Sequence, residues 1–314
     1  MKVYITGGAG YIGTHLVSAL NAAGIESVVI DNLSKQPGQK FKFSNEFYKI
    51  DLSGEKASKE LEAIFSSGTE EDVVVHLAAK KSVAESVINP TLYEKNNLGG
   101  TNNLLKAIEK SRIRHIVFAS SAAVYGGANE VVSEDSACKP ESPYATVKLA
   151  EEEVIRESSR TFGLQHLILR FFNVIGAASP EMIEIHGENI LPVLISRSRM
   201  KKPFHIFGMD YSTPDGTCIR DYISVIDIVD AIIKSIAYSK KDESLILNLG
   251  SEKGSSVLEL LDIAHCFLNF EQVVDVRREG DAARLITNSK LAFKKIGWLP
   301  NTSVTDAIKS GIPS

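Results

Sequence analysis

The stretch Val3-Tyr-Ile-Thr-Gly-Gly-Ala-Gly-Tyr-Ile-Gly13 decides the fold of this chain. Its first four residues predict a short strand, its glycines a tight turn, and the apolar spacing that follows a helix. Gly7 allows the turn, Gly10 lets the backbone approach a ligand, and Gly13 lets the helix pack close to the strand. Such a turn at a helix N-terminus binds the pyrophosphate of a dinucleotide. The contacts expected here are Gly7, Gly10, Tyr11, Ile12 and Gly13.

Six further short runs of β-branched and apolar residues, similar to residues 3–6, alternate with amphipathic stretches along the chain. The seven predicted strands are residues 3–6, 27–30, 47–50, 73–77, 115–120, 166–172 and 245–249. Regular alternation of strand and helix predicts right-handed βαβ units around a parallel sheet. The predicted fold class is therefore α/β, with a doubly wound Rossmann sheet.

The alternation stops after Phe172. Residues 174–220 carry four prolines and scattered glycine, which predicts irregular structure with short helices. The alternation of strand and helix returns over residues 221–250, and residues 251–314 form another mixed segment. We predict a Rossmann domain of residues 1–173 that binds the dinucleotide, and residues 221–250 return to this domain. The remaining segments, 174–220 and 251–314, are predicted to form a smaller discontinuous substrate lobe.

Composition excludes several classes of protein. The 314 residues include 35 Lys+Arg and 39 Asp+Glu without basic runs, which argues against a nucleic-acid or membrane-surface partner. Polar residues and glycines interrupt the apolar N-terminal region, so no membrane helix is expected. Three cysteines, far apart in sequence, favour neither a disulfide framework nor a metal site, and a cytoplasmic location is expected.

Asp31 ends the second predicted strand, 18 residues after Gly13. A carboxylate there accepts hydrogen bonds from both adenosine ribose hydroxyls and repels the 2′-phosphate of NADP, so the predicted cofactor is NAD. A glycine turn without a ligand is the alternative, and the complete strand, turn and helix context disfavours it. Asp51, followed by Leu52 after the third strand, is a candidate for the adenine amino group or an ordinary exposed loop residue.

The stretch Ser142-Pro-Tyr-Ala-Thr-Val-Lys148 predicts a helix start, with Ser142 as N-cap and Pro143 at the first helical position. Tyr144 and Lys148 are four residues apart and share one face. An ammonium beneath the phenol and the nearby helix N-terminus favour phenolate, which suits Tyr144 to take a proton from a sugar hydroxyl. The alternative is an ordinary surface pair.

Ser120 and Ser121 end the fifth predicted strand, at the sheet edge where open α/β folds bind ligands. Ser121 is placed to share or relay a proton. Two alanines follow it, so this strand end offers no carboxylate as a second acid or base. Ser121, Tyr144 and Lys148 are the predicted catalytic residues.

With these residues in view, the chain resembles the extended short-chain dehydrogenase/reductase family, and within it the nucleotide-sugar 4-epimerases. The resemblance runs the whole length, and its later motifs are more specific than the glycine turn. The matching motifs are residues 7–15, Asp31-Asn32-Leu33, His76-Leu-Ala-Ala-Lys-Lys-Ser-Val, Asn96-Asn97, residues 120–126, Ser142-Pro-Tyr144, Arg170-Phe-Phe-Asn173, Asp215-Gly-Thr-Cys-Ile-Arg-Asp-Tyr-Ile and Arg278-Glu-Gly-Asp281.

The resemblance implies an isomerase with tightly held NAD. Hydride would leave C4 of a UDP-hexose while Tyr144 takes the O4 proton. The 4-keto sugar would then rotate about its link to the diphosphate, and hydride would return to the opposite face of the sugar. UDP-glucose and UDP-galactose would thereby be interconverted. The missing carboxylate after Ser121 fits an epimerase better than the dehydratases and decarboxylases of the family.

The resemblance also implies further site residues. For the cofactor it adds Asn32, Asp51, Leu52, Lys81, Asn96, Tyr144, Lys148 and Phe172 to the glycine turn and Asp31. For the substrate it implies Ser121, Tyr144, Asn173, Asn189, Ile190, Phe207, Arg220, Arg278, Asp281 and Leu285. Asn173 and the two arginines would hold the diphosphate, which guanidinium forks suit. The alternative for residues 277–281, Glu279 included, is a solvated turn of mixed charge.

Two departures from the family pattern stand out. The chain is short between Asn173 and Asn189, and Lys80 replaces a residue that is often hydrophobic. Leu285 stands where relatives that exclude N-acetyl sugars carry a tyrosine, so we expect tolerance of a bulkier C2 substituent.

Two other functions are compatible with the sequence. One is a 4-epimerase of N-acetylated or uronic UDP-sugars, and the other is an NAD-sensing module on the same fold. No metal is expected, because the histidines form no ligand pattern. A homodimer through helices near 95–110 and 149–162 is expected from the resemblance, with only a partial apolar stripe of Leu149, Val154, Ile155 and Phe162 in support.

Overall fold

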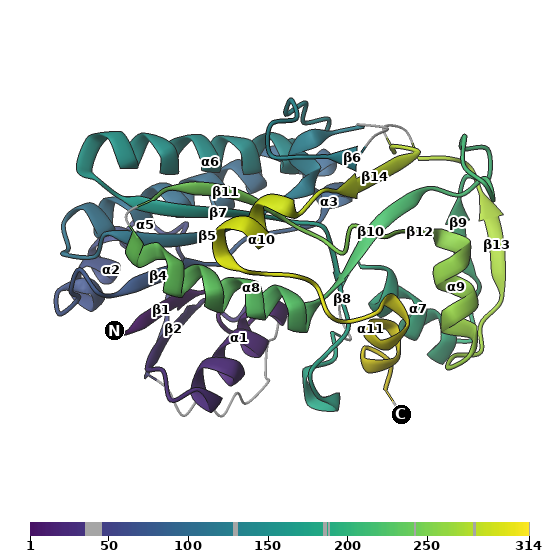
Figure 1. Ribbon diagram of the computed structural model, residues 1–314, viewed down its shortest axis with the longest axis horizontal. Coiled ribbons are helices and arrows are strands. Elements are labelled where there is room, and N and C mark those ends of the chain that lie inside the picture. Colours follow the sequence, from purple (N-terminus) through teal and green to yellow (C-terminus); the bar gives the residue numbers. More distant parts are fainter. Residues whose placement is uncertain are drawn as a thin grey trace. The chain divides into compact units, whose positions relative to one another are not determined.

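The computed structural model describes residues 1–34, 46–127, 131–184, 187, 189–241, 243–278 and 281–313 (Figure 1). The chain divides into two compact units. Unit 1 comprises Met1–Val124, Ser142–Arg170 and Ile232–Leu247, and unit 2 comprises Tyr125–Glu141, Phe171–Ala231 and Asn248–Ser314. Residues 125–141 and 221–231 thus fall in unit 2, whereas the sequence placed them in the cofactor domain. The cofactor and substrate roles of the two parts stay predictions.

Seven strands form one sheet in the order β11-β7-β5-β4-β1-β2-β3. They are β1 (Val3–Thr6), β2 (Ser27–Asp31), β3 (Glu46–Lys49), β4 (Val73–His76), β5 (His115–Ser121), β7 (Gln165–Phe171) and β11 (Leu245–Leu249). The pairs β1–β2, β1–β4, β2–β3 and β4–β5 are parallel. The doubly wound sheet and its seven predicted strands are confirmed. The strand order reverses beside β1, the switch point where such sheets bind ligands.

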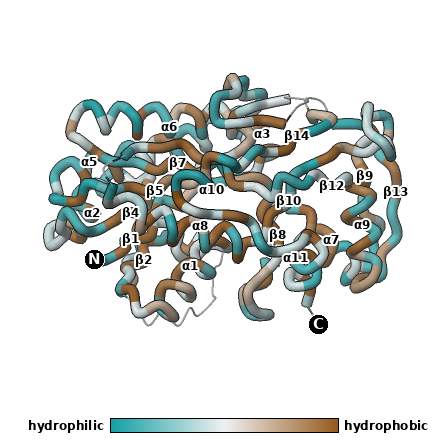
Figure 2. The backbone as a smooth tube through the Cα atoms, viewed as in Figure 1, coloured by the Kyte–Doolittle hydropathy of each residue, from teal (hydrophilic) through white to brown (hydrophobic). Residues whose placement is uncertain are grey.

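Helices cover both faces of this sheet. The helices are α1 (Tyr11–Ala22), α2 (Ala57–Phe65), α5 (Gly99–Glu109), α6 (Pro143–Phe162) and α8 (Val225–Tyr238). On one face, Tyr4 and Phe118 pack with Phe65 of α2, Leu104 of α5 and Ile155 of α6. Figure 2 shows hydrophobic residues along the strands and mixed hydropathy along α6. None of the described helices is long and apolar enough to cross a membrane.

Three short helical segments link β4 to α5. They are α3 (Val83–Ile88), α4 (Pro90–Tyr93) and the π-helical turn η1 (Glu94–Leu98). Ser82 caps α3 by accepting a hydrogen bond from the Glu85 backbone, and Pro90 begins α4. π-Helical turns are frequent at functional sites because they displace a side chain from the regular helical position.

Unit 2 is built from shorter elements. Its strands are β6 (Val131–Val132), β8 (Asn173–Ile175), β9 (Phe204–Phe207), β10 (Ile219–Ser224), β12 (Gly254–Ser256), β13 (Gln272–Asp275) and β14 (Arg284–Thr287). Its helices include α7 (Ile190–Arg199), α9 (Val257–His265), α10 (Lys290–Ile296) and α11 (Val304–Ser310). Strand β10 pairs in parallel with β8 and β14. Strands β8 and β9 were not predicted, because they lie in or beside residues 174–220, whose prolines and glycines indicate irregular structure.

Candidate active site

The glycine turn of unit 1 joins β1 to α1 as predicted, and its backbone leaves no room for side chains. Gly7 has a φ of +73°, and a Cβ there would lie 2.6 Å from the backbone nitrogen of Ala78. A Cβ on Gly13 would lie 2.3 Å from the Gly7 carbonyl oxygen. Gly10 is the N-cap of α1 and has no side chain to occupy the first N–H groups of the helix. The turn therefore fits a pyrophosphate.

Asp31 lies directly beside this turn. Its Oδ2 accepts a hydrogen bond from the Ala9 backbone at 3.1 Å, and its Oδ1 accepts one from the Leu33 backbone at 2.7 Å. Burial raises the pKa of Asp31, while these two backbone donors lower it. Each carboxylate oxygen keeps further lone pairs, so the group fits a pair of ribose hydroxyls.

The other residues expected at the adenosine end have local roles. Asn32 accepts a hydrogen bond from the Ser34 backbone, and Asp51 accepts two from Ser53, through the backbone and the hydroxyl. Leu52 is buried in the core of the sheet. Their contacts with adenine therefore stay predictions.

The loop after β4 brings two predicted cofactor residues together. The Lys81 ammonium lies over the Tyr11 ring, 5.7 Å from its centroid. The side chain of Asn97 accepts a hydrogen bond from the Lys80 backbone N–H at 2.8 Å and donates one to the Lys80 carbonyl at 2.9 Å. The sequence assigned no role to Asn97, the second residue of the Asn96-Asn97 motif, and its two hydrogen bonds fix this loop. Its neighbour Asn96 is partly exposed on η1.

Helix α6 begins as predicted. Ser142 accepts a hydrogen bond from the Ala145 backbone, and Pro143 is the first helical residue. The Tyr144 backbone donates to the Ser86 hydroxyl at 3.1 Å. The Tyr144 ring packs edge-on against Tyr93, with 6.3 Å between centroids. These contacts fix both the backbone and the ring of the candidate base.

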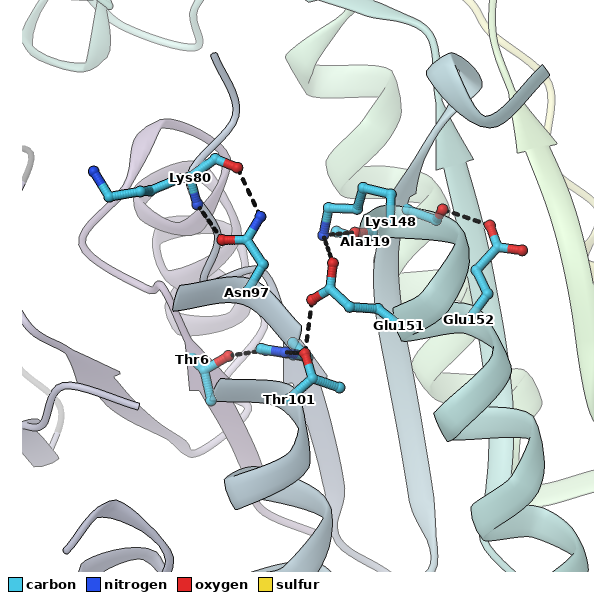
Figure 3. Close-up of polar contacts among 10 residues, drawn as sticks. Thr6, Lys80, Asn97, Thr101, Ala119, Lys148, Glu151 and Glu152 are labelled. Carbon is cyan, nitrogen blue, oxygen red and sulfur yellow. Dashed lines mark hydrogen bonds and ion pairs between the residues drawn. The ribbon is translucent and has the colours of Figure 1, made fainter. Parts of the chain in front are cut away.

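Lys148 is buried and held by β5 and by its own helix (Figure 3). Its Nζ donates to the Ala119 carbonyl oxygen at 3.0 Å and lies 3.1 Å from Oε2 of Glu151. It also lies over the Phe118 ring, 4.5 Å from the centroid. The sequence paired Lys148 with the Tyr144 phenol alone and missed Glu151.

The two serines at the end of β5 differ in their partners. The Ser120 hydroxyl donates to Oε1 of Glu152 at 2.5 Å, and Glu152 also receives two hydrogen bonds from Arg170, at 2.9 and 2.7 Å. Ser121 is partly exposed and accepts a hydrogen bond from the Ala123 backbone. Ser120 is therefore committed to a buried ion pair, while Ser121 remains the candidate for substrate contact.

In unit 2, three predicted substrate residues lie together. Arg220 of β10 is the cross-strand partner of Leu285 on β14. Its Nη1 donates to the Ala282 carbonyl at 2.7 Å, and its Nη2 lies 3.6 Å from Oδ1 of Asp281. Hydrogen bonds of this kind orient the guanidinium and leave other N–H groups for an anion.

The remaining predicted residues of unit 2 are placed as follows. The Arg278 guanidinium stacks on Phe207, 3.8 Å from the ring centroid. Asn189 donates to Glu184 and is followed by Ile190, which packs against the core of the unit. Phe172 is buried, Asn173 is exposed at the start of β8, and Glu279 lies outside the described residues.

Comparison with known proteins decides the family. A family profile described as NAD dependent epimerase/dehydratase matches residues 3–250. UDP-glucose 4-epimerase of Halalkalibacterium halodurans is 37% identical over 309 residues, which cover 96% of this chain and 91% of the relative. The chain belongs to the NAD dependent epimerase/dehydratase family.

Solved structures agree with this membership. UDP-glucose 4-epimerase from Stenotrophomonas maltophila, with bound NAD and formylated UDP-arabinopyranose, superposes with a TM-score of 0.91 at 31% identity. The alignment covers 99% of this chain and 96% of that one. The UDP-Glc/GlcNAc 4-epimerase of Campylobacter jejuni gives a TM-score of 0.83 at 34% identity, covering 99% and 97%.

Membership in the NAD dependent epimerase/dehydratase family agrees with the predicted cofactor. The residues of the glycine turn and Asp31 would hold the pyrophosphate and the adenosine ribose of NAD. No group of three His, Cys, Asp or Glu residues that would hold a metal ion occurs in the described part of the chain. His15 and His76 are buried and bonded to the Tyr11 carbonyl and the Thr6 hydroxyl.

Proposed function

We propose that this protein is a UDP-glucose 4-epimerase, which interconverts UDP-glucose and UDP-galactose with bound NAD. The arrangement at the end of β5 carries the proposal. Lys148 bonds the Ala119 carbonyl, so the α6 face that bears Tyr144 and Lys148 packs against the strand that ends in Ser121. Two alanines follow Ser121, so the residues directly after it supply no carboxylic acid, and Tyr144 of α6 is the proposed base. That set suits a reaction without net elimination or redox change.

The described residues of unit 1 would act on the hydroxyl at C4 of the sugar. NAD, held by the glycine turn and Asp31, would supply the acceptor for the C4 hydride. Tyr144 takes the O4 proton and gives it back, and Ser121 orients O4 and shares that proton. The Lys148 ammonium favours the phenolate form. Because proton and hydride both return, nothing is consumed.

Unit 2 would bind the nucleotide end of the substrate. Arg220 and Arg278 present guanidinium groups that match diphosphate oxygens. Asn173 would donate its side-chain amide to the same diphosphate. Asp281 would accept hydrogen bonds from the uridine ribose. Relatives that carry the same activity in their names span nearly the whole chain, which supports this assignment.

Incubation with UDP-galactose and no added NAD tests the proposed function. We expect UDP-glucose to form until the two sugars reach equilibrium, and we expect denatured protein to release NAD. Release of mainly NADP, or no change in the sugar while NAD is bound, would contradict the proposal.

A second candidate substrate class is the N-acetylated UDP-hexoses. Leu285 is half-buried beside Arg220, and it lacks the ring and hydroxyl of tyrosine. The relative from Campylobacter jejuni is named as a UDP-Glc/GlcNAc 4-epimerase. We expect kcat/KM for UDP-galactose to exceed that for UDP-N-acetylgalactosamine by less than about 10³-fold, and Leu285→Tyr to widen the ratio. A larger ratio in the unmodified protein would contradict the roomy pocket.

A homodimer in the cytoplasm completes the proposal. The three cysteines are free, which supports a reducing compartment. The stripe expected at the dimer interface gives no support, because Ile155 is fully buried in the core of unit 1 and Val154 and Phe162 pack against it. Light scattering at micromolar concentration tests the dimer, and a monomeric mass would contradict it.

A further inference from the structure

The buried carboxylate of Glu151 lies beside Lys148 and takes no part in the proposed proton and hydride transfers. The side chain of Glu151 is 0% exposed and that of Lys148 is 4% exposed. Burial of a charge is costly unless an opposite charge compensates it, so each group depends on the other. The pair lies on α6 (Figure 3). Lys148 is about one helical turn after Tyr144 in the sequence, and Glu151 about two turns.

A chain of hydrogen bonds ends on this carboxylate. Oε1 of Glu151 lies 2.7 Å from the Thr101 hydroxyl, which lies 2.9 Å from Nε2 of His76. Nδ1 of the same histidine lies 2.6 Å from the Thr6 hydroxyl. Strand β1, strand β4 and helix α5 thus each contribute one side chain, and together they connect the sheet to α6.

The direction of the chain follows from its charges. Burial, then the nearby Lys148 charge, lowers the pKa of His76 to about 3, so its ring is neutral and has one N–H. If Glu151 is ionised, Thr101 donates to it and accepts from Nε2–H of His76, and Thr6 donates to Nδ1. Every hydroxyl and ring nitrogen then has a partner. The reverse direction would require a protonated Glu151 and leave the Lys148 ammonium beside a neutral acid.

An ionised Glu151 changes the electrostatic potential at the Tyr144 phenol. A lone ammonium on the shared face of α6 would favour phenolate strongly. An ammonium with a carboxylate 3.1 Å away forms a pair of zero net charge, whose field falls off faster with distance. The phenol of Tyr144 should therefore ionise at a higher pH than it would beside Lys148 alone.

We propose that Glu151 is a positioning residue that holds the Lys148 ammonium, offsets its charge and thereby sets the pH at which Tyr144 ionises. This proposal deepens the proposed function and rests on it for the role of Tyr144. The hydrogen-bonded chain from Thr6 ends with the Thr101 hydroxyl donating to Glu151, and the Ala119 carbonyl accepts from the other side of the Lys148 ammonium.

The other charged groups named here, on α6 and on elements that contact it, are either paired or exposed to water. Glu85 accepts a hydrogen bond from the Tyr93 hydroxyl at 2.8 Å and lies 3.6 Å from the Lys80 ammonium. The neighbouring Glu152 is committed to Arg170. Glu94 and Lys95 on η1, and Lys106 and Glu109 on α5, are exposed to water, which screens them.

Glu151→Gln in the holoprotein tests the charge, and Glu153→Gln, at the exposed next-but-one position of the same helix, is the matched control. Tyrosinate absorbance is titrated in each protein, and the curve of the same protein carrying Tyr144→Phe is subtracted, which isolates one phenol among nine tyrosines. We expect Glu151→Gln to lower the ionisation midpoint of Tyr144 by about one pH unit. Glu153→Gln should leave it unchanged. An unchanged or raised midpoint in Glu151→Gln would overturn the proposal.

A double variant keeps the test decisive if Glu151→Gln does not fold. Lys148→Met with Glu151→Leu replaces the buried pair by apolar side chains of similar size, a change that folded proteins often tolerate. We expect its Tyr144 midpoint to lie closer to the wild-type value than that of Lys148→Met alone, which should be raised. A midpoint equal to that of Lys148→Met would show that Glu151 offsets nothing.

Activity gives a second readout. The acid limb of the epimerisation profile should move to lower pH in Glu151→Gln, in step with the absorbance midpoint. A purely structural role would lower the thermal unfolding midpoint and leave both pH midpoints in place, which would contradict the proposal. Absence of epimerisation in the wild type would refute the proposed function, and the absorbance titration would still decide the role of Glu151.

Discussion

The candidate catalytic residues of unit 1 and the candidate diphosphate residues of unit 2 are held in different ways. Tyr144 and Lys148 are buried, and short contacts from three other elements fix them. The Arg220 side chain is 16% exposed and its partner Asp281 is 36% exposed, while Arg278 is an exposed residue stacked on Phe207. Rigid burial suits a group that must meet one reacting atom. Partly exposed arginines suit a flexible diphosphate that must enter and leave.

This difference predicts that substitutions in unit 1 mainly lower kcat. Tyr144→Phe should lower kcat for UDP-galactose by at least about 10²-fold, since it removes the only base proposed at O4. Bound NAD and the circular dichroism spectrum should be retained. Steady-state kinetics of the purified variant checks this, and near-normal turnover would remove Tyr144 from the mechanism.

Ser121→Ala is the matched comparison within the same site. Because Ser121 only shares the proton, its loss should reduce kcat less than the loss of the phenol does. A larger effect than that of Tyr144→Phe would exchange the roles of the two residues.

Substitutions in unit 2 should mainly raise KM. Arg220→Ala should raise KM for UDP-galactose by about 10-fold or more, the scale of a lost charge-assisted hydrogen bond, with a smaller change in kcat. Arg284→Ala, an exposed arginine on β14, is the control and should leave KM unchanged. Equal KM values for Arg220→Ala and Arg284→Ala would contradict the role of Arg220 in substrate binding, and with it the proposed difference between the two units.

Asp31→Ala should weaken NAD retention by about 10-fold, because the hydrogen bonds to the ribose hydroxyls are lost. The measurement is the amount of NAD that stays with the protein during repeated dilution. Asp51→Ala separates the two interpretations of that residue, since an adenine contact would also reduce retention and a loop residue would not. Full retention by Asp31→Ala would contradict the assignment of the ribose site.

A separate prediction concerns the free energy of unfolding, which should fall in acid because of buried histidines in unit 1. Burial lowers the pKa of His76 to about 3 and that of His166 to about 4, from an ordinary value near 6.5. A histidine with a lowered folded pKa stabilises the fold fully above 6.5 and progressively less below it. At pH 5.5 each should cost about 1.4 kcal/mol of the free energy of unfolding.

Hydrogen exchange locates that loss. Amides of β4 and β7 in unit 1 should lose protection between pH 7 and 5.5, after correction for intrinsic exchange rates, and those of β10 in unit 2 should lose less. Equal losses in both units would contradict a source in the buried histidines.

Local signals explain what the sequence predicted. The glycine turn, the Ser142 cap and the seven strands depend on neighbours in the chain, and the structure confirms all of them. Glu151 and Glu152 were missed because the run Glu151-Glu152-Glu153 looks like a solvated helix face. Two of the three are buried, and their burial depends on Thr101, Ser120 and Arg170, which other elements supply. Asn97 was missed for the same reason, since its partner is the backbone of Lys80.

The central claim is that hydride leaves C4 of the sugar and returns to the same carbon within one protein molecule. UDP-galactose deuterated at C4, incubated with the purified protein and no added NAD, tests it most directly. The account predicts UDP-glucose with the deuterium retained at C4, and no deuterium at C4 when unlabelled substrate reacts in D₂O. Loss of the label from C4 to solvent would contradict it.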